Sequence, residues 1–383
     1  MKSFSINFSR IFVGTLFIFS GVIKMNDPIG FSFKLEEYFG EDVLNLVFLQ
    51  PLALSLAVFV VIYEVILGVT LLLGIWKRLT LTSLAAMMAF FTFLTFYSAY
   101  FDKVTDCGCF GDAIPLKPWE SFGKDVILSI LIAVLIFGRD SIQPILNFRL
   151  NRLVLSMSIF LSVCFSYYVL NHLPIWDFRA YKPGTDVAQA MLSAEELGLK
   201  PPLYETYYTM SGPGGESLEI SGTDYINKKM WEKKEFKIDP SKTSSKKISD
   251  GYEPPIHDFT ISIDGMDRTK EFIAGNVIWL IAYDFKKSNY DDLKRLTKEL
   301  SEYSEISGNK VVGMTSSSDE QILKLVNETS CSFPWAVMDG TALKTINRSN
   351  PGVTYLEDGI ILKHLHYNDV VLSSESEELD WQE

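Results

Sequence analysis

The sequence predicts a helical membrane bundle followed by a water-exposed α/β domain, and two observations lead to this prediction. Of the 383 residues, 48% are hydrophobic, a high share for a soluble protein, and nearly all of the excess lies before about residue 173. The rest of the chain is rich in Lys, Asp, Glu and Ser and alternates strand-like with helix-like segments. The net charge of −12 comes mainly from this second half, which disfavours binding to nucleic acid or to an anionic membrane surface.

The apolar half divides into segments long enough to cross a membrane, since a bilayer core of about 30 Å needs roughly 20 apolar residues per helix. The fourth segment is the weakest, because Lys124 and Asp125 fall in its first turn. The first segment could instead be a signal peptide, but no small-residue cleavage site follows it, so we expect it to be retained. The five expected spans are residues 8–25, 52–76, 79–101, 122–138 and 153–173.

Basic residues in the short connections predict the orientation of these spans, because Lys and Arg resist translocation. All three basic groups fall on one side, which we expect to be the cytoplasm. The loop at residues 26–50 and the loop after the third span then face outward, and an odd number of spans exports the C-terminal half. We expect a bacterial inner-membrane protein with a cytoplasmic N-terminus and a periplasmic C-terminal domain. The basic residues are Lys2, Arg10, Lys77, Arg78, Arg139, Arg149 and Arg152.

Two of the four cysteines lie one residue apart in the loop after the third span, in the segment DCGCFGD. Gly108 gives the backbone the freedom to bring Cys107 and Cys109 within disulfide range. A ring that small is strained, and strained exposed disulfides are easily reduced, so the pair points to redox chemistry. Inert loop thiols are an alternative. A metal site is disfavoured, because two cysteines cannot complete a four-ligand zinc site and His172 and His257 are the only histidines that could approach.

Glu64 lies near the middle of the second span, where a charge is costly. It should therefore face the bundle interior and be protonated or find a partner. One interpretation is a proton-handling or quinone-facing group, and the other is a neutral carboxyl bonded to a neighbouring helix. Lys24 and Asp27 are interpreted as ordinary anchors at the outer end of the first span, and Cys164 as a small apolar filler in the fifth.

Four motifs carry a resemblance to a known family: RIFVGTLFIFSGVIKMNDPIGF, YEVILGVTLLLG, DCGCFGD and SFGKDVILSILIAVLIF. Over about the first 140 residues they resemble the four-helix DoxX-like membrane proteins and their relatives, the MauE-type methylamine-utilisation proteins. The segment NHLPIWDFRAYKPGT resembles a subgroup in which a fifth helix leads into an extracytoplasmic domain. The resemblance implies a thiol–disulfide or quinone-linked redox component, with Cys107 and Cys109 as the dithiol pair, Glu64 as a buried acid and quinone as the candidate cofactor.

The last third alternates strands and helices. A buried strand, NVIWLIAYDF, precedes an amphipathic helix, and the strand KVVGMTS precedes a second helix. FPWAVMD, a short helix and a hairpin turning at Asp358-Gly359 complete the pattern. Over roughly residues 255–370 this order resembles a thioredoxin fold of the membrane-tethered TlpA type. In that family a cis-proline precedes the third core strand, and Pro351 stands in the matching place.

The departure from that family is a missing cysteine pair. Where a CxxC would follow the first core strand, this chain has AYDFKKSNYDD, so residues 285–289 occupy the redox loop without a thiol. We expect Phe285, Lys286 and Pro351 to line a cleft that binds a partner peptide or a true thioredoxin. Cys331 is the only thiol of this region, and it is either structural or the partner of a mixed disulfide with the CGC pair.

The expected domains are a four-helix unit at 1–147, a fifth membrane helix at 148–175, a β-rich linker with hairpins at 176–253, a thioredoxin-like domain at 254–370 and an acidic disordered tail at 371–383. Two functions fit. In the first, the CGC pair relays electrons between extracytoplasmic thiols and a membrane carrier such as quinone. In the second, the chain is a non-catalytic scaffold for envelope partners and the disulfide only ties a loop. Small residues that allow close helix packing, within the chain or in an oligomer, are Gly14, Gly21, Gly68 and Gly74.

Overall fold

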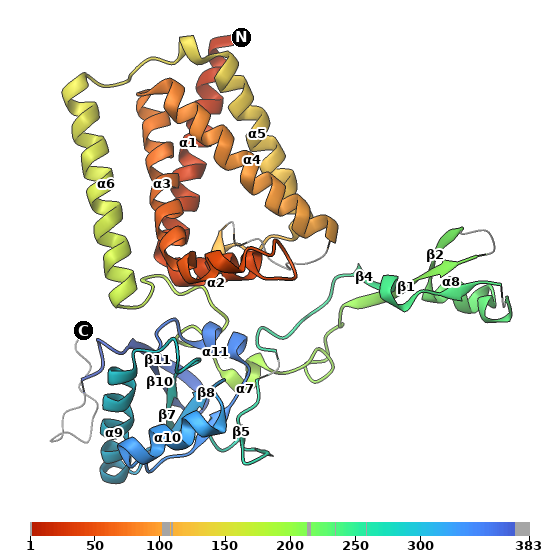
Figure 1. The fold of residues 1–383 in the computed structure, drawn as a ribbon, viewed down its shortest axis with the longest axis vertical. Coiled ribbons are helices and arrows are strands. Elements are labelled where there is room, and N and C mark those ends of the chain that lie inside the picture. Colours follow the sequence, from red (N-terminus) through yellow and green to blue (C-terminus); the bar gives the residue numbers. More distant parts are fainter. Residues whose placement is uncertain are drawn as a thin grey trace. The chain divides into compact units, whose positions relative to one another are not determined.

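The computed structural model describes residues 2–101, 108, 110–212, 216–233, 235–257 and 259–371 (Figure 1). Contacts between residues group the chain into two compact units. One contains residues 1–184 together with 260–383, and the other contains residues 185–259. The first unit thus combines the apolar helices with the C-terminal sheet. Cys107 and Cys109 lie outside the described residues, whereas Gly108 between them is described.

The apolar half forms a helical bundle in which α1 packs along α3, α4 along α5, and α6 against α3 (Figure 1). Its core contains Val13, Phe17, Leu84 and Leu135. Small residues let α1 approach α3 closely, since a Cβ placed on Gly68 would lie 2.7 Å from the carbonyl oxygen of Gly14. The long helices are α1 (Lys2–Asn26), α3 (Ala53–Leu73), α4 (Lys77–Phe101), α5 (Pro118–Phe137) and α6 (Phe148–Asn171), with short turns η2 (Gly111–Ala113) and η3 (Arg139–Ser141).

Four of the helices in the described part of the chain are long and apolar enough to cross a membrane: Phe4–Asn26, Val47–Leu73, Lys77–Phe101 and Phe148–Asn171. They correspond to the first, second, third and fifth expected spans. Helix α5, the expected fourth span, does not meet these criteria, because Glu120, Lys124 and Asp125 lie in its first turns. It nevertheless packs against α4 and α1, and contributes Leu128, Ile132 and Leu135 to the core.

The segment expected to be an outer loop at residues 26–50 instead contains helix α2 (Pro28–Phe39) and a 3₁₀ helix, η1 (Val47–Leu52). Asp27 caps α2 by accepting a hydrogen bond from the Gly30 amide, and Pro28 begins the first turn, as proline commonly does. Phe31, Leu35 and Tyr38 recur on one face of α2 and are buried. The segment therefore covers the end of the bundle.

Residues 185–259 form a small β-rich unit. The sequence predicted hairpins here, and strands β1 and β2 are indeed antiparallel neighbours. Strand β1 also pairs with β3 and β4, and Met210, Ile220 and Met230 form a small core. The elements are α7 (Val187–Ala190), β1 (Leu203–Ser211), β2 (Ser217–Ser221), α8 (Gly222–Asn227), η4 (Met230–Glu232), β3 (Lys237–Ile238), η5 (Pro240–Lys242) and β4 (Ser244–Ser249).

The C-terminal region, which we call the sheet domain (residues 260–371), has a seven-stranded sheet of order β11-β10-β7-β8-β9-β5-β6. Strands β7, β8 and β9 run parallel, whereas β10 pairs antiparallel with β7 and β11. Its elements are β5 (Ser262–Ile263), β6 (Met266–Asp267), β7 (Asn276–Ile281), α9 (Tyr290–Ser307), β8 (Lys310–Thr315), α10 (Asp319–Thr329), β9 (Trp335–Val337), α11 (Gly340–Ile346), β10 (Gly352–Glu357) and β11 (Ile360–His366).

The predicted order of strands and helices in the sheet domain is observed. Leu293, Leu296 and Leu300 place one face of α9 against the sheet, as the helical spacing of the sequence predicts. The hairpin turns at Asp358 and Gly359, whose φ angles of 47° and 84° are those of a type I′ turn. The Asn350–Pro351 bond is cis and stands directly before β10.

Candidate functional site

Glu64 lies inside the bundle and has a charged partner. It comes from α3, and the Nζ atom of Lys24 on α1 lies 2.5 Å from its Oε2 atom. Both side chains are buried, with exposed fractions of 4% for Lys24 and 7% for Glu64. The Lys24 ammonium also lies over the rings of Phe31 and Phe91, at 5.4 and 5.3 Å. Lys24 is therefore not the interfacial anchor that we expected, because α2 folds over it.

A second charged pair lies at the start of α5. Asp125 is almost fully buried, its Oδ1 atom lies 2.7 Å from Lys124 Nζ, and its Oδ2 atom accepts a hydrogen bond from the Thr95 hydroxyl of α4. The Lys124 ammonium lies 5.3 Å from the centre of the Phe110 ring. Buried ion pairs rarely add stability beyond that of an apolar pair of similar size. Stability therefore does not by itself explain the buried Lys24–Glu64 pair, beside which lies a partly buried pair whose Lys124 side chain is 23% exposed.

Both pairs line one small cavity of about 30 Å³, which is enough for one or two water molecules. Gly108 and Phe110 of the CGCF segment line the same cavity. Gly108 has a φ of +65°, a conformation that glycine adopts most readily, and a Cβ at this position would lie 3.2 Å from Lys34. The residue between the two cysteines is thus at a cavity that contains two carboxylates and two ammonium groups. Cys107 and Cys109 themselves lie outside the described residues.

An apolar groove lies behind the aromatic residues of this cavity. The groove has a volume of about 290 Å³ and shares Phe31, Leu35 and Phe91 with the charged cavity. Phe59 and Phe90 also line it and are exposed on the outside of the bundle. Its polar contact is a hydrogen bond from the Tyr63 hydroxyl to Ser83. The rings of Phe31 and Phe91 therefore separate a surface groove from the buried Lys24–Glu64 pair.

A wider chamber, which we call the vestibule, lies between the bundle and the sheet domain and has a volume of about 690 Å³. Gly108, Lys24 and Phe31 line both the vestibule and the small cavity. Helix α11 and the residues after it form another wall, through Thr341, Lys344, Thr345 and Arg348. The vestibule therefore leads to the glycine of the CGC segment from the side of the sheet domain.

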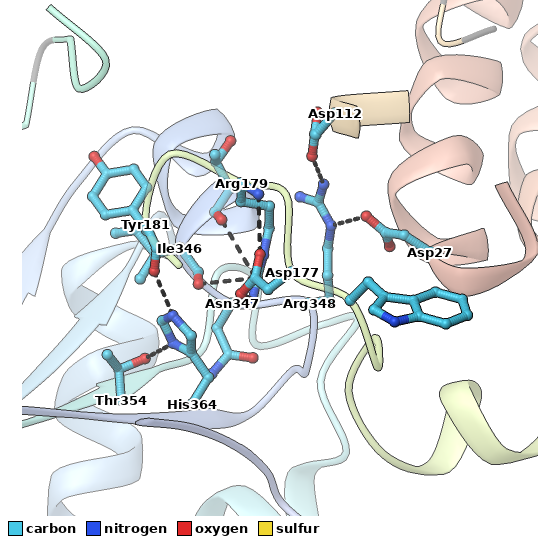
Figure 2. A network of polar contacts seen from close by, with 12 residues as sticks. Asp27, Asp112, Asp177, Arg179, Tyr181, Ile346, Asn347, Arg348, Thr354 and His364 are labelled. Carbon is cyan, nitrogen blue, oxygen red and sulfur yellow. Dashed lines mark hydrogen bonds and ion pairs between the residues drawn. The ribbon is translucent and has the colours of Figure 1, made fainter. Parts of the chain in front are cut away.

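Arg348 joins the two walls of the vestibule. Its Nε atom donates to Asp27 at 2.8 Å and its Nη2 atom donates to Asp112 at 2.8 Å (Figure 2). Its Nη1 atom donates to the Lys344 carbonyl oxygen. Burial alone would lower the pKa of the Arg348 guanidinium, but the attraction of Asp27 and Asp112 outweighs burial and raises the pKa. The guanidinium is therefore held in the charged form.

A second polar network joins residues 177–181 to the sheet domain (Figure 2). Arg179 pairs with Asp177 and donates to the carbonyl oxygen of Ile346, while the His364 ring contacts the Thr354 hydroxyl and the Tyr181 carbonyl oxygen. Burial, followed by the charge of Arg179, lowers the pKa of His364 to about 4. A neutral imidazole that donates to Tyr181 and accepts from Thr354 satisfies both ring nitrogens, so this network holds the segment before the linker onto the sheet.

The residues expected to form a cleft in the sheet domain are differently placed. Phe285 is buried, and its ring packs edge-on against Trp335 with a centroid distance of 5.2 Å. Pro351 is also buried, whereas Lys286 is exposed. Cys331 is half-buried, and burial raises the pKa of its thiol, which disfavours the reactive thiolate. No group of three or more His, Cys, Asp or Glu in the described ranges is arranged to hold a metal ion.

Residues 2–138 match the family model described as methylamine utilisation protein MauE. The part of the bundle from α1 to α5 is therefore MauE-like. This match confirms the expected likeness to MauE-type proteins over the first third of the chain. The chain is also similar to the protein TlpB of Flavobacterium psychrophilum, with 28% identity over 139 residues that cover 33% of this chain and 35% of TlpB. The matched part thus spans about a third of that relative, and no solved structure matches the chain.

The sequence analysis identified Glu64 but missed three residues near it. Two of them line its cavity and the third lines the vestibule. Lys24 and Asp125 were interpreted as residues near helix ends, and Arg348 was not singled out. One signal was available for Lys24: the segment after it begins with Asp-Pro and repeats apolar residues at helical spacing, which predicts a covering helix. Cys164 was expected to be buried, but it is exposed on the surface of α6.

Proposed function

We propose that this chain is an inner-membrane thiol–disulfide redox component in which Cys107 and Cys109 relay electrons between extracytoplasmic thiols and a membrane carrier. The observation that carries the proposal is the position of Gly108, the residue between the two cysteines, at a cavity lined by Glu64, Lys24 and Asp125. Thiol–disulfide exchange with a carrier moves protons as well as electrons, and these side chains are groups that bind and release protons.

The reaction balances as two exchanges. An extracytoplasmic dithiol reduces the Cys107–Cys109 disulfide, so that one disulfide forms, one breaks, and two protons and two electrons pass to the CGC pair. The CGC dithiol then gives two electrons and two protons to the carrier and returns to the disulfide. With a quinone as carrier the product is the quinol. Both exchanges run backwards if the carrier is the electron donor.

A quinone suits the carrier role because of the apolar groove between α3 and α4. A lipid-soluble ring could approach from the bilayer along Phe59 and Phe90, and only the rings of Phe31 and Phe91 separate that groove from Lys24. The Lys24 ammonium is a hydrogen-bond donor for a quinone oxygen, and Glu64 is its neighbouring proton carrier. The quinone site is therefore proposed at Phe31 and Phe91.

The proposed topology includes α5 as a fifth span. Lys124 and Asp125, two of the three charged residues that weaken it as a span, line the cavity that Gly108 also lines, so they face the protein interior. Five spans place the CGC segment and the sheet domain together on the periplasmic side, where disulfides persist. We propose that the sheet domain is thioredoxin-like and lacks exchange activity of its own, because residues 285–289 contain no cysteine.

Thiol trapping in native membranes tests this function. Membranes are acid-quenched and labelled with a gel-shifting maleimide, in a Cys164→Ser, Cys331→Ser background that isolates the CGC pair. We expect reduced and oxidised forms together, in a ratio that shifts when quinone turnover is blocked. A Cys107→Ser variant controls for the band assignment. A pair that stays oxidised under every condition contradicts the proposal and favours the alternative, a non-catalytic scaffold whose disulfide ties a loop.

A further inference from the structure

Arg348 makes a contact that the redox chemistry does not itself require. It stands in the sheet domain between α11 and Pro351, and its side chain is only 7% exposed. Two of its three hydrogen-bond partners belong to the bundle (Figure 2). An arginine fork between two carboxylates fixes their separation as well as their charge, which a flexible lysine does not do.

The two carboxylates belong to different parts of the bundle. Asp27 follows α1, three residues beyond Lys24, and caps α2 through its other oxygen. Asp112 lies in η2, three residues beyond Cys109 in the sequence. The guanidinium therefore connects the segment that follows the CGC pair to the segment that carries Lys24, the partner of Glu64. A Cβ placed on Gly30 would lie 2.8 Å from the Arg348 Nη2 atom, so a larger residue there would push against the fork.

The other ion pairs between the sheet domain and α2 are more exposed than the Arg348 contacts, and one further contact joins two aromatic rings. Lys287 lies 3.2 Å from Glu36, and Lys344 lies 3.8 Å from the same carboxylate. Phe33 on α2 meets Tyr283 edge-on at 5.9 Å between ring centres. Exposed pairs of this kind contribute little to stability. Arg348 is the buried ion-pairing group on this side of the described sheet domain, and we expect it to dominate the contact.

We propose that Arg348 is a positioning residue that, through Asp112 and Asp27, holds the segment around Gly108 and Asp112 beside the cavity. The inference rests on the proposed function for its purpose, because a dithiol that exchanges electrons with a buried site must be kept beside that site. It assigns a role to a sheet domain that has no cysteine pair of its own: the domain braces the redox loop of the bundle from outside. The vestibule beside Arg348 then remains as the route by which a thiol-bearing partner reaches the loop.

The test measures accessibility of a single thiol, so it does not depend on electron transfer. A chain that retains only Cys107, with Cys109, Cys164 and Cys331 changed to serine, is labelled in right-side-out membrane vesicles with a membrane-impermeant maleimide. We expect Arg348→Met to raise the labelling rate about tenfold or more, because two charged hydrogen bonds to the loop segment and to α2 are lost. Arg348→Lys should raise the labelling rate less, because a lysine ammonium can replace some of the hydrogen bonds that the guanidinium makes to Asp27 and Asp112.

Arg295→Met is the matched control. Arg295 is an arginine of the same domain that pairs with Asp292 and Glu299 of its own helix and donates to the Tyr367 carbonyl oxygen. The Arg295→Met variant should leave the labelling rate of Cys107 unchanged. If Arg348→Met fails to fold, Asp112→Asn tests the same contact from the bundle side and should also raise the rate. Equal rates in the parent chain and in folded Arg348→Met or Asp112→Asn variants overturn the proposal.

The result separates the positioning role of Arg348, which we call the brace, from the proposed redox function. If labelling rises but the natural pair never cycles in the trapping experiment, the brace stands and the redox function fails. If the natural pair cycles but labelling is unaffected by Arg348→Met, the redox function stands and the brace fails.

Discussion

The bundle and the sheet domain both bury charged and polar groups, but they do so differently. Where residues 177–181 meet the sheet domain, Arg179 pairs with Asp177, and Arg179 and His364 also bond to backbone carbonyl groups. In the bundle, Lys24, Glu64 and Asp125 line a cavity with room for water. A fully bonded network fixes a structure. Asp177 and Arg179 also line open space, because they form part of the vestibule wall, but they pair with each other. The candidate site is assigned to the bundle because its cavity brings Glu64 and Asp125 beside Gly108 of the CGC segment.

The same contrast applies to the two sets of predicted site residues. Phe285 and Pro351 of the sheet domain are buried, so they offer little surface to a partner. Glu64 is also buried, but its carboxylate lines a cavity. Burial alone therefore does not distinguish a structural residue from a residue that takes part in a reaction. A buried polar residue that also lines a cavity is the better candidate for a reactive one.

The largest effect that tests the comparison of the bundle with the sheet domain is expected from variants of the Lys24–Glu64 pair. Lys24→Met or Glu64→Leu alone leaves one charge buried without its partner, which costs about 3–5 kcal/mol in unfolding free energy. The double variant removes both charges and should recover most of that loss. Thermal unfolding of the detergent-purified protein measures this effect.

Thiol trapping of the same variants decides between chemistry and architecture. We expect the double variant to fold but to leave the CGC pair in one redox state, because the proton-handling groups are gone. Recovery of both stability and redox cycling in the double variant would mean that the pair is purely structural, like the network of the sheet domain.

The membrane helices were largely predictable, because twenty-residue apolar runs and basic connections are strong signals. The strand and helix order of the sheet domain was equally clear from its alternation and from the Asp358-Gly359 turn. Glu64 could be found because a carboxylate in an apolar span is rare. Helix α2 was missed because its apolar face is short and mixed with charged residues.

Arg348 could not be found from sequence in the same way. Its partners Asp27 and Asp112 lie 321 and 236 positions away along the chain. No local spacing brings such residues together, and only the docking of the sheet domain on α2 does so. The Lys24–Glu64 pair is an intermediate case, since Glu64 predicts that some partner exists but does not say which helix supplies it.

A smaller effect is expected from acid on the sheet domain. The pKa of His364 is lowered to about 4, and burial also lowers the pKa of His366 to about 4. An unfolded histidine titrates near pH 6.5, so between about pH 6.5 and 4 the unfolded chain binds protons that the folded chain excludes. Stability should therefore fall as the pH decreases through this window. Thermal unfolding at pH 7 and pH 5 measures the loss.

His364→Gln sharpens this prediction, because its amide can still donate to the Tyr181 carbonyl oxygen but has no proton to gain. The variant should lose less stability between pH 7 and pH 5 than the parent chain, and a His364→Gln, His366→Gln double variant should lose less again. An unchanged pH dependence in the double variant would show that other groups, such as the Asp177–Arg179 pair, control acid stability.

The smallest effect is expected from Lys287, which meets Glu36 on α2 with a side chain that is 56% exposed. Water and salt screen such a pair, so Lys287→Ala should change the unfolding free energy by about 0–1 kcal/mol and leave the labelling rate of Cys107 unchanged. Arg348 contacts the same face of the bundle from a buried position. If Lys287→Ala exposed Cys107 as strongly as Arg348→Met, the weak exposed contacts together would hold the sheet domain in place, and burial of the guanidinium would not be what gives Arg348 its effect.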